Sequence, residues 1–304
     1  MKHRILVGAA LAAAVTAAFA VPAAASVLAG ASVQAGTAAR PLTGRAVYFD
    51  YKAGKFSVDR YEPGSGFVRI GRPSDNFQFS ASPDGRKLAW ITVAGKVLVK
   101  DGSKITTVAK APTGGPCATP TWSSDSKQVA FVGKADVVTV VNADGTGRHA
   151  AGKTTGVCHL TWSGNGRYLA GYAGTADAVY RLDLRTGRAA KAKGVKLVTH
   201  VQSLSPDGRN VIMSPPVDPG AMGDGGWPSS FTPVIVDMVT GRKVPIPVKG
   251  RLLGAFYLAD GRLVVRVAGG AHHTLVVLDK QGKESQRLGE PAQAKKQGLL
   301  QIVP

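Results

Sequence analysis

A short hairpin motif that recurs along the chain limits its possible folds more than any other sequence feature. Its clearest form is FSASPDGRKLAW at residues 79–90, which reads as a strand, a Ser-Pro-Asp-Gly turn and a second strand. Variants of it occupy 120–132, 160–172, 202–213 and 255–267. The turn residues Asp84, Asp125, Asn165, Asp207 and Asp260 are 41, 40, 42 and 53 positions apart. A period of this length indicates an array of similar structural units.

A second glycine turn follows each copy of the motif. It contains Gly102, Gly145, Gly187, Gly241 or Gly282. Glycine supplies the positive φ of tight hairpins, and the segments between turns are rich in β-forming residues. Each unit of about forty residues therefore reads as four strands, which is typical of a β-propeller blade. We expect the recurring aromatic residues to pack between blades; they are Trp90, Trp122, Phe131, Trp162 and Tyr172.

The two ends of the repeat array complement each other. Three strands at 46–51, 55–62 and 67–70 precede the first full unit and lack an innermost strand, whereas 298–303 is a single strand after the last unit. We expect this last strand to complete the first blade, because closing the ring pairs the backbone groups that an open edge would expose. The prediction is an all-β, six-bladed β-propeller of four-stranded antiparallel blades.

The N-terminus has the order of a secretory signal. Lys2 and Arg4 precede an apolar, Ala-rich run, Pro22 and a string of small residues. An uncleaved membrane anchor is the other interpretation, although a run broken by proline suits a stop-transfer helix poorly. We expect a signal peptide at 1–25, with cleavage after 35 as the alternative, a flexible segment at 26–43 and one propeller domain at 44–304.

No later stretch is long and apolar enough to form a membrane-spanning helix. The sequence therefore predicts a monomeric protein that is secreted or associated with the cell envelope.

The repeats resemble the WD40-like repeat of TolB-type β-propellers. The match is full at 79–90 and 202–213, whereas Asp125-Ser126 and Gly164-Asn165-Gly166 depart from the Asp-Gly pattern, and Leu258-Ala259 replaces Ser-Pro. The resemblance covers nearly the whole mature chain. It implies a binding platform or an accessory domain of a peptidase, and it does not identify a ligand.

The chain is strongly basic, with a formal net charge of +19. A cation stands beside each hairpin turn, so two rings of positive charge are expected on one face of the propeller. The inner ring contains Arg86, Lys127, Arg167, Arg209 and Arg262, and the outer ring contains Lys104, Arg148, Arg188, Arg242 and Lys283. These cations could bind an anionic envelope polymer, or they could be solvated turn residues that neighbouring aspartates neutralise. No signature of specific nucleic-acid binding occurs.

One segment breaks the period. Residues 215–230, PPVDPGAMGDGGWPSS, lengthen the fifth blade and contain Met222 and Trp227. Long irregular loops in compact folds often carry function. We predict that Met222, Trp227 and His200 contact a protein or polymer partner on the face formed by the loops that enter the inner strands. The alternative is a decoration without a binding role.

Cys117 and Cys158 are the only cysteines, and they are 41 residues apart, about one repeat. An even number of cysteines in an exported chain favours a disulfide. A pair of buried free thiols is the alternative.

Sequence motifs for catalysis are absent. The chain contains neither a Gly-x-Ser-x-Gly elbow nor a His-Glu-x-x-His pattern. Cys158-His159 matches no zinc-ligand spacing, and we expect no metal and no cofactor. The predicted function is a non-catalytic binding or scaffold module. The alternative is a propeller-type lyase or hydrolase whose catalytic residues are scattered around the channel mouth.

Overall fold

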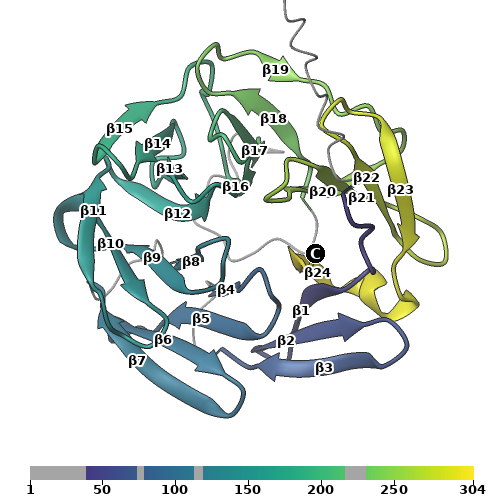
Figure 1. Ribbon diagram of the computed structural model, residues 1–304, viewed down its shortest axis with the longest axis horizontal. Helices are drawn as coiled ribbons and strands as arrows, with labels where there is room; N and C mark the ends of the chain where they lie inside the picture. Colours follow the sequence, from purple (N-terminus) through teal and green to yellow (C-terminus); the bar gives the residue numbers. More distant parts are fainter. Residues whose placement is uncertain (1–38, 74–78, 113–118, 216–230) are drawn as a thin grey trace, which may run out of the picture. The chain divides into compact units, whose positions relative to one another are not determined.

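The chain forms a closed ring of β-sheets. The computed structural model describes residues 39–73, 79–112, 119–215 and 231–304. They form six four-stranded antiparallel sheets around a central axis (Figure 1). The prediction of a six-bladed β-propeller is confirmed. Within these four ranges, no helix has the length and apolar character needed to cross a membrane.

Each of the first three blades runs outward from a strand that lines the axis. Blade 1 contains β24 (Gly298–Ile302), β1 (Ala46–Lys52), β2 (Lys55–Glu62) and β3 (Gly66–Gly71). Blade 2 contains β4 (Phe79–Ala81), β5 (Lys87–Ile91), β6 (Lys96–Asp101) and β7 (Lys104–Lys110). Blade 3 contains β8 (Thr121–Trp122), β9 (Gln128–Val132), β10 (Val137–Asn142) and β11 (His149–Lys153).

The other three blades repeat this order. Blade 4 contains β12 (Val157–Trp162), β13 (Tyr168–Ala173), β14 (Val179–Asp183) and β15 (Arg188–Lys191). Blade 5 contains β16 (His200–Leu204), β17 (Asn210–Ser214), β18 (Val234–Asp237) and β19 (Lys243–Val244). Blade 6 contains β20 (Leu252–Tyr257), β21 (Leu263–Val267), β22 (Thr274–Leu278) and β23 (Glu284–Gly289). Two short 3-10 helices are η1 (Lys134–Asp136) and η2 (Ala292–Lys296).

The recurring serine and aspartate build the hairpin turn. In blade 2, the Ser82 hydroxyl donates to the Asp84 carboxylate at 2.5 Å and accepts the backbone N–H of Lys87 at 2.9 Å. Gly85 has a φ of +69°, which a β-carbon would strain. The same hydroxyl-to-side-chain bond recurs at Ser123–Asp125, Ser163–Asn165 and Ser205–Asp207. These residues are therefore occupied by turn geometry.

The turn of blade 3 has a serine in place of glycine, and this serine also bonds to the turn of blade 2. Ser126 stands where the other turns have glycine, and its φ is +60°. Its hydroxyl accepts the backbone N–H of Asp84 at 3.0 Å, and its carbonyl accepts the Lys87 ammonium at 3.0 Å. The strained residue thus joins the turns of blades 2 and 3.

The hydrophobic core lies between adjacent blades, as the repeat predicted. Trp90, Trp122, Phe131 and Tyr172 are each at most 4% exposed, whereas Trp162 is half-buried. Phe131 and Trp122 of blade 3 pack with Ala89 and Ile91 of blade 2 in one cluster. The prediction that the recurring aromatics are core residues is confirmed for the four buried ones.

The last strand closes the ring. β24 pairs with β1 in antiparallel register, with Tyr48 opposite Leu299 and Phe49 opposite Gly298. A β-carbon on Gly298 would lie 2.2 Å from the Phe49 ring, so only glycine permits this approach. The predicted completion of blade 1 by the C-terminal strand is confirmed.

A buried ion pair holds the segment that leads into the closing strand. Arg266 on β21 donates to Glu290 at 2.8 Å, and their side chains are 1% and 0% exposed. The other guanidinium nitrogens donate to the carbonyls of Ala294 and Gln297, both at 2.9 Å. Tyr48 on β1 donates its hydroxyl to Glu290 at 2.8 Å. Burial, with the adjacent Glu290, raises the pKa of Tyr48, so this hydroxyl stays a donor.

The residues just before blade 1 contact blade 6. Leu42 is 5% exposed, and its backbone N–H and carbonyl both bond to the Gln286 side chain at 2.8 Å. The Arg40 carbonyl accepts the Arg262 guanidinium at 2.9 Å. The end of the segment that we assigned to 26–43 is thus attached to the propeller.

Truncation tests the closure. Removing 298–304 is expected to abolish cooperative unfolding in calorimetry. The buried Leu299, Leu300, Ile302 and Val303 contribute about 1.5–3 kcal/mol each, which together rivals the whole 5–15 kcal/mol stability expected of a domain. Gln301→Ala, in the same strand, should shift the Tm by less than about 4 °C. A truncated chain that melts near the full-length Tm would refute closure as a source of stability.

The buried ion pair gives a second prediction. Arg266→Gln leaves the Glu290 carboxylate buried without its cation, so we expect a loss of about 3–5 kcal/mol in the free energy of unfolding measured by urea titration. The matched control is Arg287→Gln, because Arg287 pairs with Glu284 at 2.7 Å with both side chains about half exposed. It should leave the free energy of unfolding close to that of the native chain, because solvent screens an exposed pair. Equal losses for the two variants would contradict the assigned role of burial.

Candidate functional site

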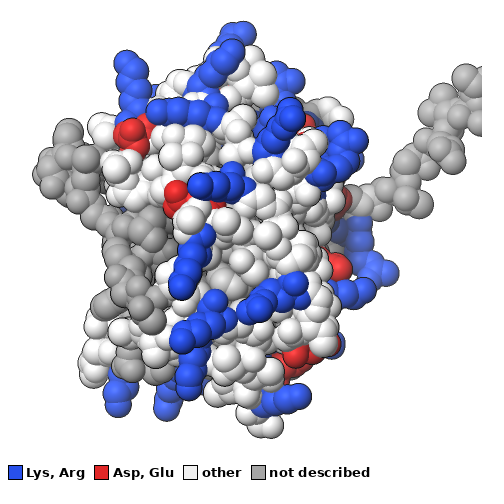
Figure 2. Space-filling view, turned by 90° about the vertical axis from the view of Figure 1, so that its left-hand side faces the viewer, with Lys and Arg blue, Asp and Glu red and all other residues white. Residues whose placement is uncertain are grey.

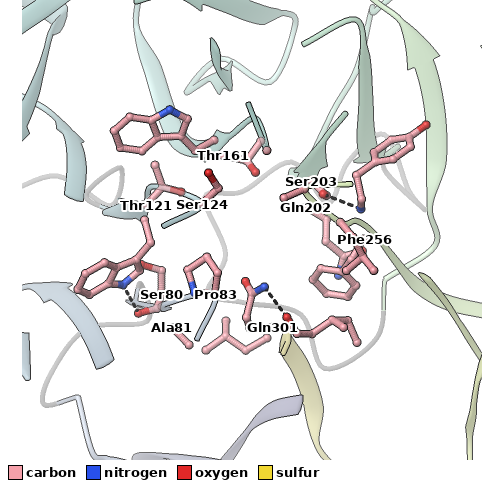
Figure 3. A pocket seen from close by; sticks show the side chains of 18 of the residues that line it. Ser80, Ala81, Pro83, Thr121, Ser124, Thr161, Gln202, Ser203, Phe256 and Gln301 are labelled. Atoms are coloured by element: carbon pink, nitrogen blue, oxygen red, sulfur yellow. Dashed lines mark hydrogen bonds between the residues drawn. The ribbon is translucent and has the colours of Figure 1, made fainter. Parts of the chain in front are cut away.

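A small cavity lies on the ring axis, at the end where the inner strands enter the serine turns. Its volume is about 140 Å³, and all six blades line it. Figure 3 shows the side chains converging from the inner strands around an open centre. We call this cavity, with the turns around it, the channel mouth. The polar residues that line it are Ser80, Thr121, Ser124, Thr161, Gln202, Ser203 and Gln301.

Side chains satisfy the exposed edges of the inner strands. The Gln202 carbonyl oxygen accepts the backbone N–H of Ala255 at 2.8 Å, and the Ser203 hydroxyl accepts that of Tyr257 at 3.0 Å. Trp122 donates its indole N–H to the carbonyl of Ser80 at 3.2 Å. Because each bond joins two neighbouring blades, the wall of the mouth is fixed in place.

The described side chains that line the cavity are uncharged. Its lining consists of hydroxyls, amides, backbone groups, aliphatic side chains and the rings of Trp122, Trp162, Phe256 and Tyr257. Among the described residues, the lining includes no His, Asp, Glu, Lys, Arg or Cys. Burial raises the pKa of Tyr257 to about 12, so this phenol stays neutral. The mouth can donate and accept hydrogen bonds and can stack rings.

The sequence contained a signal for this site that our motif analysis missed. The position two residues before the turn serine lines the mouth in every repeat and is Ser80, Thr121, Thr161 or Ser203 in blades 2–5. Small polar residues at a fixed place in an otherwise apolar strand mark a wetted surface. In blade 6 the same position is Phe256.

His200 does not line the mouth. It stands at the start of β16, at the opposite end of the inner strand, and is 3% exposed. Its ring lies 5.3 Å from that of His159 and 6.0 Å from that of Phe231. His159 stacks on Tyr172 at 4.8 Å, and its Nδ1 lies 2.6 Å from the hydroxyl of Thr119. The histidines thus form a buried cluster that joins blades 3, 4 and 5.

Three other predicted site residues lie outside the described part of the chain, and a fourth is described only in part. Met222 and Trp227 belong to 216–230, Cys117 belongs to 113–118, and only the backbone of Cys158 is described, in β12. The partner contact of Met222 and Trp227, and the Cys117–Cys158 disulfide, therefore stay predictions.

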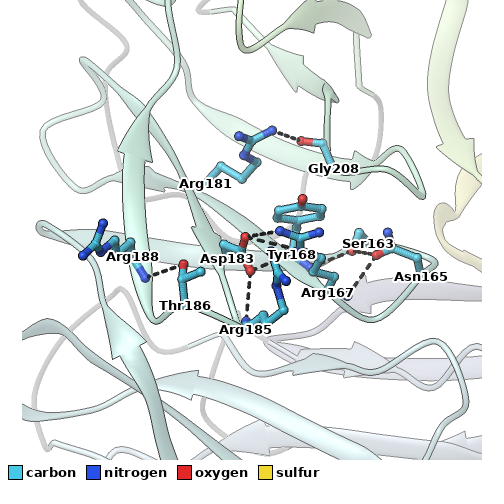
Figure 4. Close-up of polar contacts among 10 residues, drawn as sticks. All are labelled: Ser163, Asn165, Arg167, Tyr168, Arg181, Asp183, Arg185, Thr186, Arg188 and Gly208. Carbon is cyan, nitrogen blue, oxygen red and sulfur yellow. Dashed lines mark hydrogen bonds and ion pairs between the residues drawn. The ribbon is translucent and has the colours of Figure 1, made fainter. Parts of the chain in front are cut away.

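The inner ring of cations is largely used in ion pairs. Arg167 donates to Asp183 at 2.6 Å, as Figure 4 shows. Arg209 pairs with Asp237, and Arg262 pairs with Asp260, both at 2.8 Å. The guanidinium of Arg167 also lies 4.8 Å from the Tyr168 ring. For these three arginines the interpretation as neutralised turn residues is supported.

Comparison with solved structures shows the same fold. TolB from Acinetobacter baumannii matches with a TM-score of 0.51 and 15% identity, covering 85% of this chain and 67% of TolB. A chain of the nidogen/laminin complex matches with a TM-score of 0.50 and 11% identity, covering 86% of this chain and 98% of that one. This chain therefore has a TolB-type, WD40-like β-propeller fold.

The sequence comparisons add nothing to this likeness. No protein-family profile matches the chain, and no curated protein matches it. Because 1290 solved chains share the fold at this level, the architecture alone does not specify a ligand.

The buried histidine pair predicts acid sensitivity. Burial, with His159 nearby, holds the pKa of His200 well below its usual 6.5. Below pH 6.5 the unfolded chain binds a proton that the folded chain excludes. The free energy of unfolding is therefore unaffected by His200 above pH 6.5. As the pH drops below 6.5, it decreases by about 1.4 kcal/mol per pH unit until the pH reaches the folded-state pKa. Between pH 7 and 5, His200→Phe should lose about 2 kcal/mol less stability than the native chain in urea titrations.

The control for this experiment is His149→Gln, because His149 is exposed on β11. It should keep the native pH dependence. An unchanged pH dependence in His200→Phe would contradict the assignment to His200.

Proposed function

We propose that the chain is an exported, monomeric binding propeller that recognises a protein partner at the channel mouth. The observation that carries the proposal is the cavity on the axis, with hydroxyl, amide and aromatic groups from all six blades. One partner side chain would enter the cavity, and the surrounding turns would contact the rest of the partner surface. A buried anchor surrounded by near-neutral contacts is a common arrangement in protein interfaces.

The size of the cavity supports a protein partner. Small-molecule sites usually have volumes of about 300–1,000 Å³, whereas a cavity of about 150 Å³ accommodates a group the size of benzene. The mouth, at about 140 Å³, therefore suits one side chain. Its uncharged donors and acceptors favour a polar or aromatic side chain over an ionised one.

The enzyme alternative has less support from this geometry. A lyase or hydrolase needs groups that exchange protons, such as histidines and carboxylates, converging at the mouth. The described lining lacks both, and the buried histidine pair lies at the opposite end of the inner strands. Binding is the function that the geometry supports best.

Two further observations support the remaining parts of the proposal. The order of charged, apolar and small residues at the N-terminus supports export to the envelope or the extracellular space. One of the two similar structures is a chain of a complex between two proteins, nidogen and laminin. A protein-binding role for this chain is in keeping with that likeness.

Site-specific photo-crosslinking tests the proposal. Replacing Ser124, which lines the mouth, with p-benzoylphenylalanine should give one dominant protein adduct in the native envelope and secreted fractions. The same replacement at Val68, exposed on β3, should give none. Adding Thr161→Arg to the Ser124 derivative places a charge in the mouth and should reduce the adduct at least about tenfold.

Val68→Arg serves as the matched control for that charge and should leave the adduct unchanged. Equal adducts from both crosslinker positions, or an adduct that survives Thr161→Arg, would overturn the proposal.

A further inference from the structure

The outer turns of blades 4 and 5 share a sequence pattern that the channel mouth does not use. The pattern is DLRTGR at 183–188 and DMVTGR at 237–242. In both turns the aspartate bonds to its own turn and to the arginine that directly precedes the second strand of the blade. The cations that follow the aspartate point to solvent. This separation of the charges makes the two turns suited to an external anion.

The two aspartates are already neutralised. Asp183 accepts the Arg167 guanidinium at 2.6 Å and the backbone N–H of Arg185 at 2.9 Å (Figure 4). Asp237 accepts Arg209 at 2.8 Å and the backbone N–H groups of Val239 and Thr240. These bonds hold the pKa of each carboxyl at about 2. Arg167 and Arg209 are the ion-pair partners of these carboxylates, and the charge of Arg185 also lowers the pKa of Asp183.

The cations of the turn surface are exposed to solvent. Arg185, Arg188, Arg242 and Lys243 are all exposed. In the described part of the chain none of the four forms an ion pair. They belong to two neighbouring blades, blade 4 at the upper left and blade 5 at the top of Figure 1.

Close backbone packing joins the two turns. A β-carbon on Gly194 would lie 2.5 Å from the carbonyl oxygen of Gly241, so the chain after β15 touches the outer turn of blade 5. The backbone N–H of Lys193 donates to the carbonyl of Met238 at 3.0 Å. Lys193 therefore stands at the seam between the two blades, with its exposed side chain next to the turn of blade 5.

Together these residues form a track of cations along the outside of the ring. It begins at the outer turn of blade 4, follows the fully exposed strand β15, crosses the seam and ends on blade 5. One cation of the track, Lys191, has a carboxylate near it, because its charge lowers the pKa of Asp177. Figure 2 shows this flank of the molecule, where Lys and Arg greatly outnumber Asp and Glu. The track contains Arg185, Arg188, Lys191, Lys193, Arg242 and Lys243.

We propose that this track binds a phosphodiester polymer that carries no bases. A guanidinium group can donate two parallel hydrogen bonds to the oxygens of one phosphate. A row of cations on one strand and its neighbour therefore suits an extended chain of regularly spaced phosphates. Recognition of single-stranded nucleic acid would need exposed aromatic rings for base stacking. The exposed large hydrophobic residue of the blade 5 turn is instead Val239, an aliphatic side chain.

Binding of polyglycerol phosphate at several salt concentrations tests the proposal. Arg185→Gln/Arg188→Gln/Arg242→Gln should weaken the native Kd at least about tenfold at ~100 mM NaCl. It should also reduce the slope of log K against log salt by about two, since each lost phosphate contact removes roughly 0.7. The substituted side chains are exposed, so the Tm should not change.

The control removes the same charge elsewhere. Lys55→Gln/Lys96→Gln/Lys110→Gln substitutes exposed cations of blades 1 and 2 and should leave the Kd within about twofold of native. Equal weakening by the two triple variants would overturn the proposal, because binding would then depend on net charge alone. Tighter binding of poly(dT) than of polyglycerol phosphate of equal length would also overturn it, in favour of nucleic acid.

Discussion

The closing of the ring is the constraint on which the rest of the structure depends. Each blade buries its apolar faces only against its two neighbours, so an open ring would leave two blades half exposed. β24 removes the opening by pairing with β1, and the buried Arg266–Glu290 pair fixes the segment that leads into it. A buried pair is worth little unless every polar atom has a partner. Here the guanidinium of Arg266 also donates to two carbonyls, and Glu290 also accepts the Tyr48 hydroxyl. Both charged groups therefore have further hydrogen-bond partners where the ring closes.

The same logic separates structural from functional side chains elsewhere in the molecule. The serine and aspartate of each turn resemble residues of catalytic or metal sites, but their oxygen atoms bond within the turn. Ser126 shows how strictly this holds, because it replaces glycine in the turn and still contributes both its hydroxyl and its carbonyl to the blade 2 seam. The two binding sites that we propose use positions that the motif does not need: the residue two before the turn serine, and the cations that follow the outer turns.

The fold could be predicted from the sequence because period, turn chemistry and the complementary ends of the array all agree. The candidate site could not be predicted in the same way. Thr161 and Gln202 become neighbours only through the ring, which brings together positions about forty residues apart. The surroundings of His200 could not be predicted either. The structure places its ring beside those of His159 and Phe231, and its predicted partner contact stays a prediction. The sequence also did not show which cations of the two rings form ion pairs. Among the described residues, Arg167 pairs with Asp183, whereas Arg188 forms no ion pair.

The pairing of β24 with β1 also affects when the chain can finish folding during its synthesis. Blade 1 has no inner strand until residues 298–302 have been synthesised, so the first blade to emerge is the last to be completed. Domains can fold during synthesis only when their long-range contacts are available, and this contact spans almost the entire propeller. The chain must therefore stay incompletely folded until its final residues appear. A polypeptide that threads through a secretion channel also has to be unfolded, so this topology is compatible with the export that we propose.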